Sequence, residues 1–415
     1  MDTAAVHLPV EVRHQILQYL YEEEDLTVWQ KCDVLRNTRL TSHAWCQSAN
    51  ELLFDHITIT AERCLGFEVE RILKLDELCG TGLAGFVKRL GVYVSPNYYR
   101  YVDVGSGDGE GGGSKDVVQC MARYLPGCIS RLQRLEVLEV SLPRGECWAY
   151  WDDVSWDLPV DCKHSCYATI HRSLSASHLP RLRGLGLDLF DICDLETIID
   201  PFCCDAHRNV KEGEKGNPIF NRNISQIRHL SLTLKSLPRL DDCHRSCYKY
   251  NRVTSYSRAT TKPVPLLKLW RLGIRSLETL SIDVEVDEIN LDMRNYFVER
   301  LSLQNMRSIE MNRALLSYED IMHILDTNHH TLEKVTLTWG VDLPSKEPRR
   351  AMKKKLEQIR ETLKSMPRLE EAQIRSPAGH IEIPDGFLSE WGRRSWLNDG
   401  EYYFPYRDLD DLYEF

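Results

Sequence analysis

No run of the 415-residue sequence approaches the roughly 18 apolar residues needed to cross a bilayer, because charged residues interrupt its best apolar stretches, such as LLKLW. The opening segment, MDTAAVHLPVEVRHQIL, has neither the basic part nor the unbroken apolar part of a secretory signal peptide. We therefore expect a soluble protein of the cytoplasm, the nucleus or both, with no membrane partner. Its 14 cysteines are then expected to be reduced thiols, mostly small core residues.

The sequence also has fewer basic than acidic residues. The chain has 52 Lys and Arg residues against 62 Asp and Glu residues, a formal net charge of −10. This sign is wrong for a protein whose main task is to neutralise phosphates, so we expect no nucleic-acid partner. Apolar residues make up 42% of the chain and charged residues 27%, which is typical of a globular protein long enough to build a large core.

Recognisable catalytic motifs are missing as well. The sequence contains no GxSxG, HExxH or GxxxxGK[ST] motif and no kinase-type HRD with a partnering DFG. Gly107, Gly109 and Gly112 formally satisfy GxGxxG, but Asp108 and Glu110 would repel a phosphate and no helix is expected to open at the motif. We therefore expect a protein that is not an enzyme and that has no cofactor.

The first part of the chain, residues 1–60, has a helical pattern. Pro9 and Glu11 suit the first turn of a helix. The apolar residues that then recur on one face of this helix are Val12, Ile16, Leu17 and Leu20. Asp25 can cap a second helix, and a third is expected to begin at Ser42 and to end before the strand-like HITIT. The apolar stripe of the second helix is Val28, Cys32 and Leu35, and that of the third is Trp45, Ala49, Leu52 and Leu53.

Residues 61–395 repeat a pattern in which one apolar residue and two variable ones precede alternating apolar positions. The copies are Val87, Leu90, Val92, Val94; Leu135, Leu138, Val140, Leu142; Leu182, Leu185, Leu187, Leu189; Ile227, Leu230, Leu232, Leu234; Leu277, Leu280, Ile282, Val284; Leu332, Val335, Leu337; and Leu369, Ala372, Ile374. The second positions of the first five copies are 48, 47, 45 and 50 residues apart. Alternation predicts strands, and recurrence predicts an array of similar units.

Helical patterns lie between several of these strands. They are expected around residues 117–125, around 321–325 after a cap at Ser317, and around 352–363. Units of one helix and one short strand bury their apolar faces only when stacked, so we expect an α/β fold: a helical N-terminal module followed by an irregular α/β solenoid. The spacings exceed the roughly 20 to 29 residues of leucine-rich repeats, so the extra length is expected in loops or in longer helices.

Three polar segments are the expected loop insertions: residues 105–116, 205–225 and 250–263. The C-terminal segment, 396–415, mixes aromatic and acidic residues. It either caps the last repeat through Tyr402, Phe404 and Tyr406 or forms a tail.

Two segments share the pattern DCxxSCY, one with Cys162 and Cys166 and the other with Cys243 and Cys247. Four thiolates can hold zinc, and Cys203, Cys204 and His207 lie between the pairs as further possible ligands. Alternatively, both segments begin helices of equivalent repeats and the cysteines fill small core positions. Nothing in the spacing fixes a tetrahedron, so no metal site is assigned and both interpretations stay open.

The N-terminal segment LPVEVRHQILQYL resembles the first helix of an F-box, a motif that opens with Leu-Pro. The residues that match are Leu8, Pro9, Glu11, Ile16, Leu17 and Leu20. The later RLTSHAW is similar to the second F-box signature through Leu40, Ser42 and Trp45, and LLFDHITI resembles the segment that follows the box in many fungal members. The segment from Leu20 to Arg39 is some ten residues longer than in the family, as judged against the F-box pattern.

An F-box followed by degenerate leucine-rich-like repeats resembles the substrate receptors of SCF-type ubiquitin ligases, which act in ubiquitin-dependent protein degradation. The resemblance implies that the F-box docks an adaptor of the Skp family, and through it a cullin and a RING subunit, while the repeats hold a target protein. The residues expected to bind the adaptor are Leu8, Pro9, Val12, Ile16, Leu17, Leu20, Leu40 and Trp45. The alternatives are an F-box scaffold without a cullin, a structural-zinc regulatory protein, or a plain helical cap whose apolar face packs on the first repeat.

Overall fold

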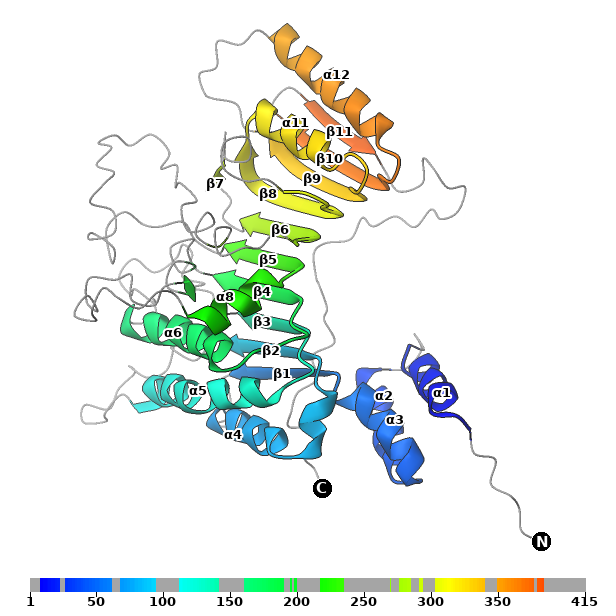
Figure 1. The fold of residues 1–415 in the computed structure, drawn as a ribbon, viewed down its shortest axis with the longest axis vertical. Helices are drawn as coiled ribbons and strands as arrows, with labels where there is room; N and C mark the ends of the chain where they lie inside the picture. The colour runs from blue at the N-terminus through cyan, green and yellow to red at the C-terminus, as the bar shows by residue number, and fades with distance from the viewer. Residues whose placement is uncertain are drawn as a thin grey trace.

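The structure is a computed structural model (Figure 1). It describes residues 8–22, 27–61, 68–94, 112–141, 160–189, 195, 198–199, 217–234, 269, 276–284, 291–293, 303–339, 349–376 and 379–383.

One long mixed sheet runs the length of the molecule (Figure 1). Its strands are β1 (His56–Ala61), β2 (Arg89–Val94), β3 (Val137–Ser141), β4 (Gly184–Leu189), β5 (His229–Leu234), β6 (Thr279–Val284), β7 (Leu291–Asp292), β8 (Ser308–Leu316), β9 (Lys334–Trp339), β10 (Glu371–Ser376) and β11 (Gly379–Ile383). The strands from β1 to β10, except β7, lie side by side in chain order and all run parallel. β11 closes the end antiparallel to β10, and β7 pairs with β8.

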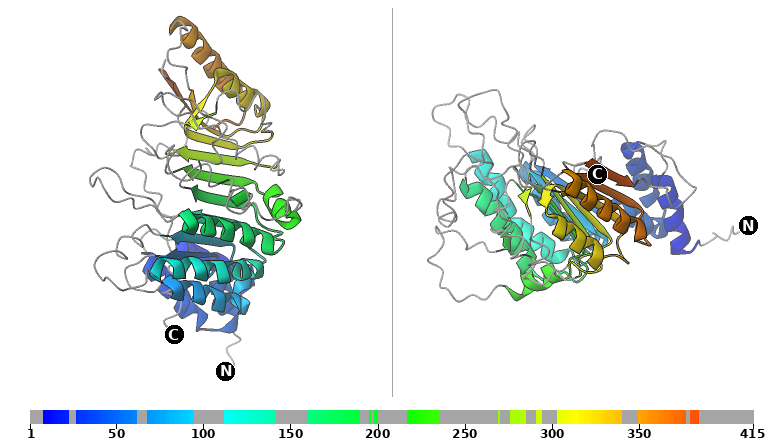
Figure 2. Two further views of the ribbon diagram at one scale, coloured as in Figure 1. Left: turned by 90° about the vertical axis from the view of Figure 1, so that its left-hand side faces the viewer. Right: turned by 90° about the horizontal axis from the view of Figure 1, so that it is seen from above.

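Helices precede the strands in the chain. They are α1 (Val10–Glu22), α2 (Val28–Arg39), α3 (His43–Leu53), α4 (Glu68–Cys79), α5 (Gly112–Arg131), α6 (Val160–Ala176), α8 (Pro218–Ser225), α11 (Tyr318–Thr327) and α12 (Arg349–Ser365), with a short 3-10 helix at Gly82–Phe86. The helices from α4 onward follow one another along the sheet in the order of the strands, while α1, α2 and α3 stand together beyond β1 (Figures 1 and 2). No helix in the described ranges is long and apolar enough to span a membrane.

The predicted strands are confirmed, and their repeat positions align. The second apolar positions pair in register from strand to strand, so that one row crosses the sheet: Ile57, Leu90, Leu138, Leu185, Leu230, Leu280, Ile309, Val335 and Ala372. All of them are buried. Along each strand, the residues that alternate with the apolar positions are mostly only partly buried. Alternate side chains of a strand point to opposite faces, so each strand gives its apolar positions to one continuous core.

One unit of the array was missed from the sequence. Met306 lies just before β8, and Ile309 and Met311 lie on it, at positions where the recognised copies carry Leu, Ile or Val. The pattern is therefore the same, with methionine in place of branched residues at two positions. Ile309 follows Leu280 by 29 residues and precedes Val335 by 26. These two units therefore have the length of leucine-rich repeats, although the earlier ones are longer.

Two predicted loops are shorter than expected. The segment 205–225 ends in α8, where Asn217 caps the helix and Pro218 occupies its first turn. The segment 105–116 overlaps α5, which opens at Gly112, so the expectation that no helix begins at the Gly-rich motif was wrong. Gly107 nevertheless lies 13 residues after Val94, the end of β2, whereas a dinucleotide loop follows its strand directly. The segments 250–263 and 396–415 lie outside the described residues.

Side-chain caps mark where several helices begin. Ser42 caps α3 and Ser317 caps α11, as predicted. The second helix has a different cap from the one expected. Thr27 Oγ1 accepts from the Gln30 backbone N–H, and Gln30 Oε1 accepts from the Thr27 backbone N–H, which forms a capping box. Asp25, the predicted cap, lies outside the described residues.

The N-terminal helices and the sheet share one hydrophobic cluster, which runs from Leu17 to Ile374. A polar joint reinforces it where α3 passes into β1. The backbone carbonyl of Asp55 accepts from the N–H groups of Lys88 and Arg89, and the Lys88 ammonium lies 2.7 Å from Asp55 Oδ1. The helical module is therefore held against the first strands by packing and by hydrogen bonds.

Candidate functional site

The three N-terminal helices form a small layer in which α3 lies between the other two and contacts both. Leu17 from α1, Leu35 from α2 and Leu53 from α3 are almost fully buried. His14 of α1 and Glu51 of α3 lie 3.5 Å apart at the edge of this contact. Each helix therefore gives one narrow apolar stripe to the interior, and the remaining apolar residues of α1 have no place inside.

Exposed large apolar side chains gather on this module. Eight are found among the described residues: Val10, Val12, Ile16, Tyr19, Leu20, Leu40, Leu73 and Ile219. Six of the eight belong to the first 40 residues of the chain. Water-exposed apolar side chains are ordinary when scattered. Five of these six lie on α1 and the sixth, Leu40, lies in the turn after α2, and such a concentration is typical of an interaction site.

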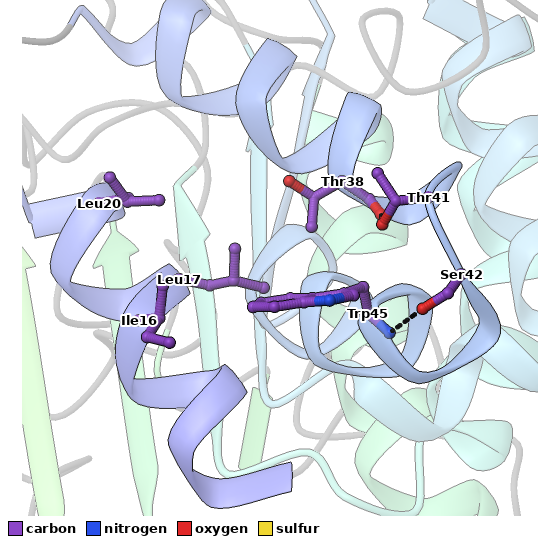
Figure 3. A pocket seen from close by; sticks show the side chains of 7 residues that line it. All are labelled: Ile16, Leu17, Leu20, Thr38, Thr41, Ser42 and Trp45. Carbon is purple, nitrogen blue, oxygen red and sulfur yellow. Dashed lines mark hydrogen bonds between the residues drawn. The ribbon is translucent and has the colours of Figure 1, made fainter. Parts of the chain in front are cut away.

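Part of this surface is hollowed into an open groove of about 470 Å³. Ile16 and Leu20 of α1 form one wall, and Trp45 of α3 lies across from them; Leu17 points toward the Trp45 ring (Figure 3). The residues that complete the lining come from the end of α2 and the turn into α3: Thr38, Thr41 and Ser42. The groove therefore has an apolar side and a short polar rim.

The polar rim is bound within its own segment. Thr38 Oγ1 donates to the Val34 carbonyl at 2.7 Å, and Thr41 Oγ1 donates to the Thr38 carbonyl at 2.8 Å. Ser42 Oγ accepts from the Trp45 backbone N–H at 3.3 Å, as a helix cap does (Figure 3). Because these hydroxyls satisfy local backbone groups, the groove offers a partner mainly apolar surface, and the cap fixes where Trp45 stands.

The structure brings half of the predicted adaptor-binding residues into the groove: Ile16, Leu17, Leu20 and Trp45. The other half lie outside it: Leu8 is half-buried, while Pro9, Val12 and Leu40 are exposed, Leu40 at 74%. Leu17 is only 2% exposed, so it serves as the floor of the groove rather than as an outward contact.

Sequence reasoning missed Thr38 and Thr41 as groove residues, and it gave Ser42 as a helix start and as part of the second F-box signature but not as an adaptor-binding residue. The sequence pattern gave little indication of this role, because two threonines ahead of a helix cap are ordinary turn composition. Position decides their role, since the turn between α2 and α3 lies beside Trp45 (Figure 3).

The cysteine pairs are only partly described. Cys162 and Cys166 both lie on α6, and Cys166 is buried in the core cluster. Cys243 and Cys247 lie outside the described residues. Within the described ranges, no three or more His, Cys, Asp or Glu side chains are grouped as metal ligands would be. The burial of Cys166 in the core fits the second interpretation of its pattern.

A scan against models of protein families finds no matching family, and a search among curated proteins finds no match.

Proposed function

We propose that this protein is the substrate-recognition subunit of an SCF-type ubiquitin ligase: the N-terminal helices act as an F-box that docks a Skp-family adaptor, and the following units act as a degenerate leucine-rich-like solenoid that holds a target protein. The observation that carries the proposal is the apolar groove on α1 and α3, with exposed apolar side chains around it. A helix face of this kind is a typical docking surface for a partner protein.

The joint between the helices and the sheet supports the second half of the proposal. The shared core and the contacts of Asp55 with Lys88 and Arg89 hold the helical module in a fixed place at one end of the array. A target bound along the array would then be held at a defined distance from the adaptor. Catalysis belongs to other subunits, and this chain contributes by raising the local concentration of the target.

The test is co-expression of the full chain with a Skp-family adaptor, followed by size-exclusion chromatography. The informative variant is Ile16→Asp combined with Leu20→Asp, since these side chains are 40% and 39% exposed on the groove wall. Matched controls are Leu73→Asp and Ile219→Asp, at 37% and 36% exposure on α4 and α8. We expect a one-to-one complex that the groove variant loses and the two controls keep.

The proposal is contradicted if the groove variant still binds the adaptor, or if the folded full chain forms no complex with it. A stable adaptor complex that recruits no cullin in a pull-down would favour the scaffold alternative over the ligase receptor.

A further inference from the structure

The edge of the sheet at which the parallel strands begin carries an uneven charge. Four residues of each unit lie there: the first residue of the strand and the three before it. For β2, β3, β4 and β5 these segments contain six Lys and Arg residues and one acidic residue: 86–89, 134–137, 181–184 and 226–229. For β6, β8, β9 and β10 they contain three Lys and Arg residues and four acidic ones: 276–279, 305–308, 331–334 and 368–371. One half of this edge is therefore basic, in a chain whose net charge is −10.

Backbone hydrogen bonds hold the basic half of the edge together. The Lys88 carbonyl accepts from the Glu136 N–H at 2.7 Å, the Glu136 carbonyl from the Arg183 N–H at 2.7 Å, and the Arg183 carbonyl from the Arg228 N–H at 2.7 Å. These residues therefore stand side by side on β2 to β5, over three strand spacings or about 14 Å. We call the six basic residues the basic edge: Lys88, Arg89, Arg134, Arg181, Arg183 and Arg228.

Two members of the basic edge are neutralised by carboxylates of the neighbouring units. The Lys88 ammonium lies 2.7 Å from Asp55 Oδ1, and Arg228 Nη1 lies 2.8 Å from Glu278 Oε1. The other four are arginines that form no ion pair with a carboxylate within the described ranges. Four positive charges are therefore left on this part of the surface.

Neutral oxygens hold two of these four arginines in place. Arg134 Nη1 donates to the Gly85 carbonyl at 3.3 Å. Arg183 Nη1 donates to the Leu182 carbonyl at 3.1 Å and to Gln226 Oε1 at 3.3 Å. Such bonds position a guanidinium without removing its charge, and a positioned group loses less entropy when a partner binds.

The remaining two, Arg89 and Arg181, are exposed. Helix ends do not account for their charge. Arg181 follows the end of α6 by five residues and Arg89 follows the end of the 3-10 helix by three, whereas the effect of a helix dipole is confined to the last turn. In the other half of the edge the cations are largely paired, as in Arg307 with Glu333 at 2.8 Å.

We propose that the basic edge binds an acidic segment of a partner protein in extended conformation. Four or five extended residues span about 14 Å, so one short stretch of Asp and Glu can reach all four unpaired arginines. A guanidinium presents two parallel N–H groups to a carboxylate, which makes arginine the suitable residue for this contact.

Nucleic acid fits the basic edge less well. The chain as a whole is negatively charged, and Glu136 stands among the arginines, where it would repel a phosphate. In the described part of this edge no Phe, Tyr or Trp is exposed for bases to stack on. A carboxylate-bearing peptide needs none of these features.

The basic edge begins next to the N-terminal helices, because Lys88 contacts Asp55 directly after α3. The strands begin on the side of the sheet where α1, α2 and α3 stand (Figure 1). The proposal goes beyond adaptor docking and does not depend on it, and its test uses no adaptor. A negative result in either test therefore leaves the other proposal standing.

The test measures the fluorescence anisotropy of a labelled poly-glutamate peptide titrated with the folded full chain at about 150 mM salt. We expect binding that weakens as salt is added, and no binding of an uncharged Gly-Ser peptide. Arg89→Glu combined with Arg181→Glu should weaken the binding roughly tenfold or more. Arg89→Gln combined with Arg181→Gln, which removes charge without reversing it, should weaken it less.

The matched control is Lys334→Glu combined with Arg368→Glu. Lys334 opens β9 as Arg89 opens β2, and Arg368 precedes β10 by three residues as Arg181 precedes β4. Both pairs of substitutions change the net charge equally, so a larger loss at the basic edge reports position rather than overall charge. Thermal unfolding should show that all variants are folded.

Three results would overturn the proposal: no binding of the poly-glutamate peptide, equal losses in the two Glu double variants, or tighter binding of a single-stranded oligonucleotide of the same length. The last result would assign the basic edge to nucleic acid instead.

Discussion

Asn328 Oδ1 accepts a 2.9 Å hydrogen bond from the backbone N–H of Met306, 22 residues earlier in the chain. The amide of Asn328 also donates to the carbonyls of Leu303 and Ile324 at 3.0 and 2.9 Å. Asn223 lies before β5 as Asn328 lies before β9, and it does the same: it accepts from the Leu179 N–H and donates to the carbonyls of Leu174 and Ser177, before β4. Both asparagines are buried, so each satisfies backbone groups that water cannot reach.

Asn328→Ala should therefore lower the free energy of unfolding by about 1–3 kcal/mol, since it leaves buried donors and acceptors without partners. Urea denaturation monitored by circular dichroism would measure this loss. The control is Asn37→Ala on the exposed side of α2, which should change stability by less than about 0.5 kcal/mol. Equal effects at the two positions would contradict the structural role of Asn328.

Ile16 and Leu17 are neighbours in sequence with opposite burial, and the two should separate binding from stability. Leu17→Ala should cost about 2–5 kcal/mol of unfolding free energy, because it leaves a cavity in the core. Ile16→Ala should leave stability within about 1 kcal/mol, since Ile16 is already 40% exposed and lies outside the core.

Thermal unfolding of both variants measures the stability, and titration with a Skp-family adaptor measures the binding. A loss of adaptor binding in Ile16→Ala without a loss of stability is the expected outcome. If Ile16→Ala destabilises the chain as much as Leu17→Ala, the groove wall is part of the core.

Asp283 gives the fold a pH dependence. Burial raises the pKa of this carboxyl above its ordinary value of 3.8, and Asp188 adds to the shift while Arg313 and the Val284 backbone oppose it. A carboxyl with a raised folded-state pKa binds its proton more tightly when folded, so it destabilises the fold at pH above that pKa. The penalty disappears as the pH falls through the folded pKa.

Asp283→Asn should accordingly be more stable than the parent chain near neutral pH. The difference should shrink as the pH falls toward the ordinary carboxyl value, and urea unfolding at a series of pH values would measure it. If the gain in unfolding free energy of Asp283→Asn does not change with pH, the titration of Asp283 is not the cause of that gain.

Gly91 has a close neighbour on the polar face of the sheet. A Cβ atom added there would lie 2.5 Å from Tyr93 Cε2, and the Tyr93 hydroxyl donates a 2.8 Å hydrogen bond to Glu139 of the next strand. Gly91→Ala should displace the ring and cost about 1 kcal/mol. The cost should vanish in a Tyr93→Ala background, and Gly82→Ala, where an added Cβ meets nothing within 4 Å, should be neutral.

Periodicity predicted the strands well because the strands of this sheet bury alternate residues, and successive side chains of a strand point to opposite faces. Leu230, Leu232 and Leu234 follow this rule and are all buried. The same reasoning missed β8, because Met306 and Met311 do not stand out as strand residues, and it missed β11, which is a short edge strand. Helix starts were predicted where a cap and apolar spacing coincided, as at Ser42 and Ser317.

The sequence by itself determined the alternation of apolar residues, the amphipathic first helix and the negative net charge, because these are local or additive properties. Only the tertiary structure decided that Leu17 turns inward while Ile16 and Leu20 stay exposed, since the approach of α3 selects one part of the apolar stripe. It alone brought Asp76 to Arg131, because contacts between residues 55 positions apart depend on how whole units stack.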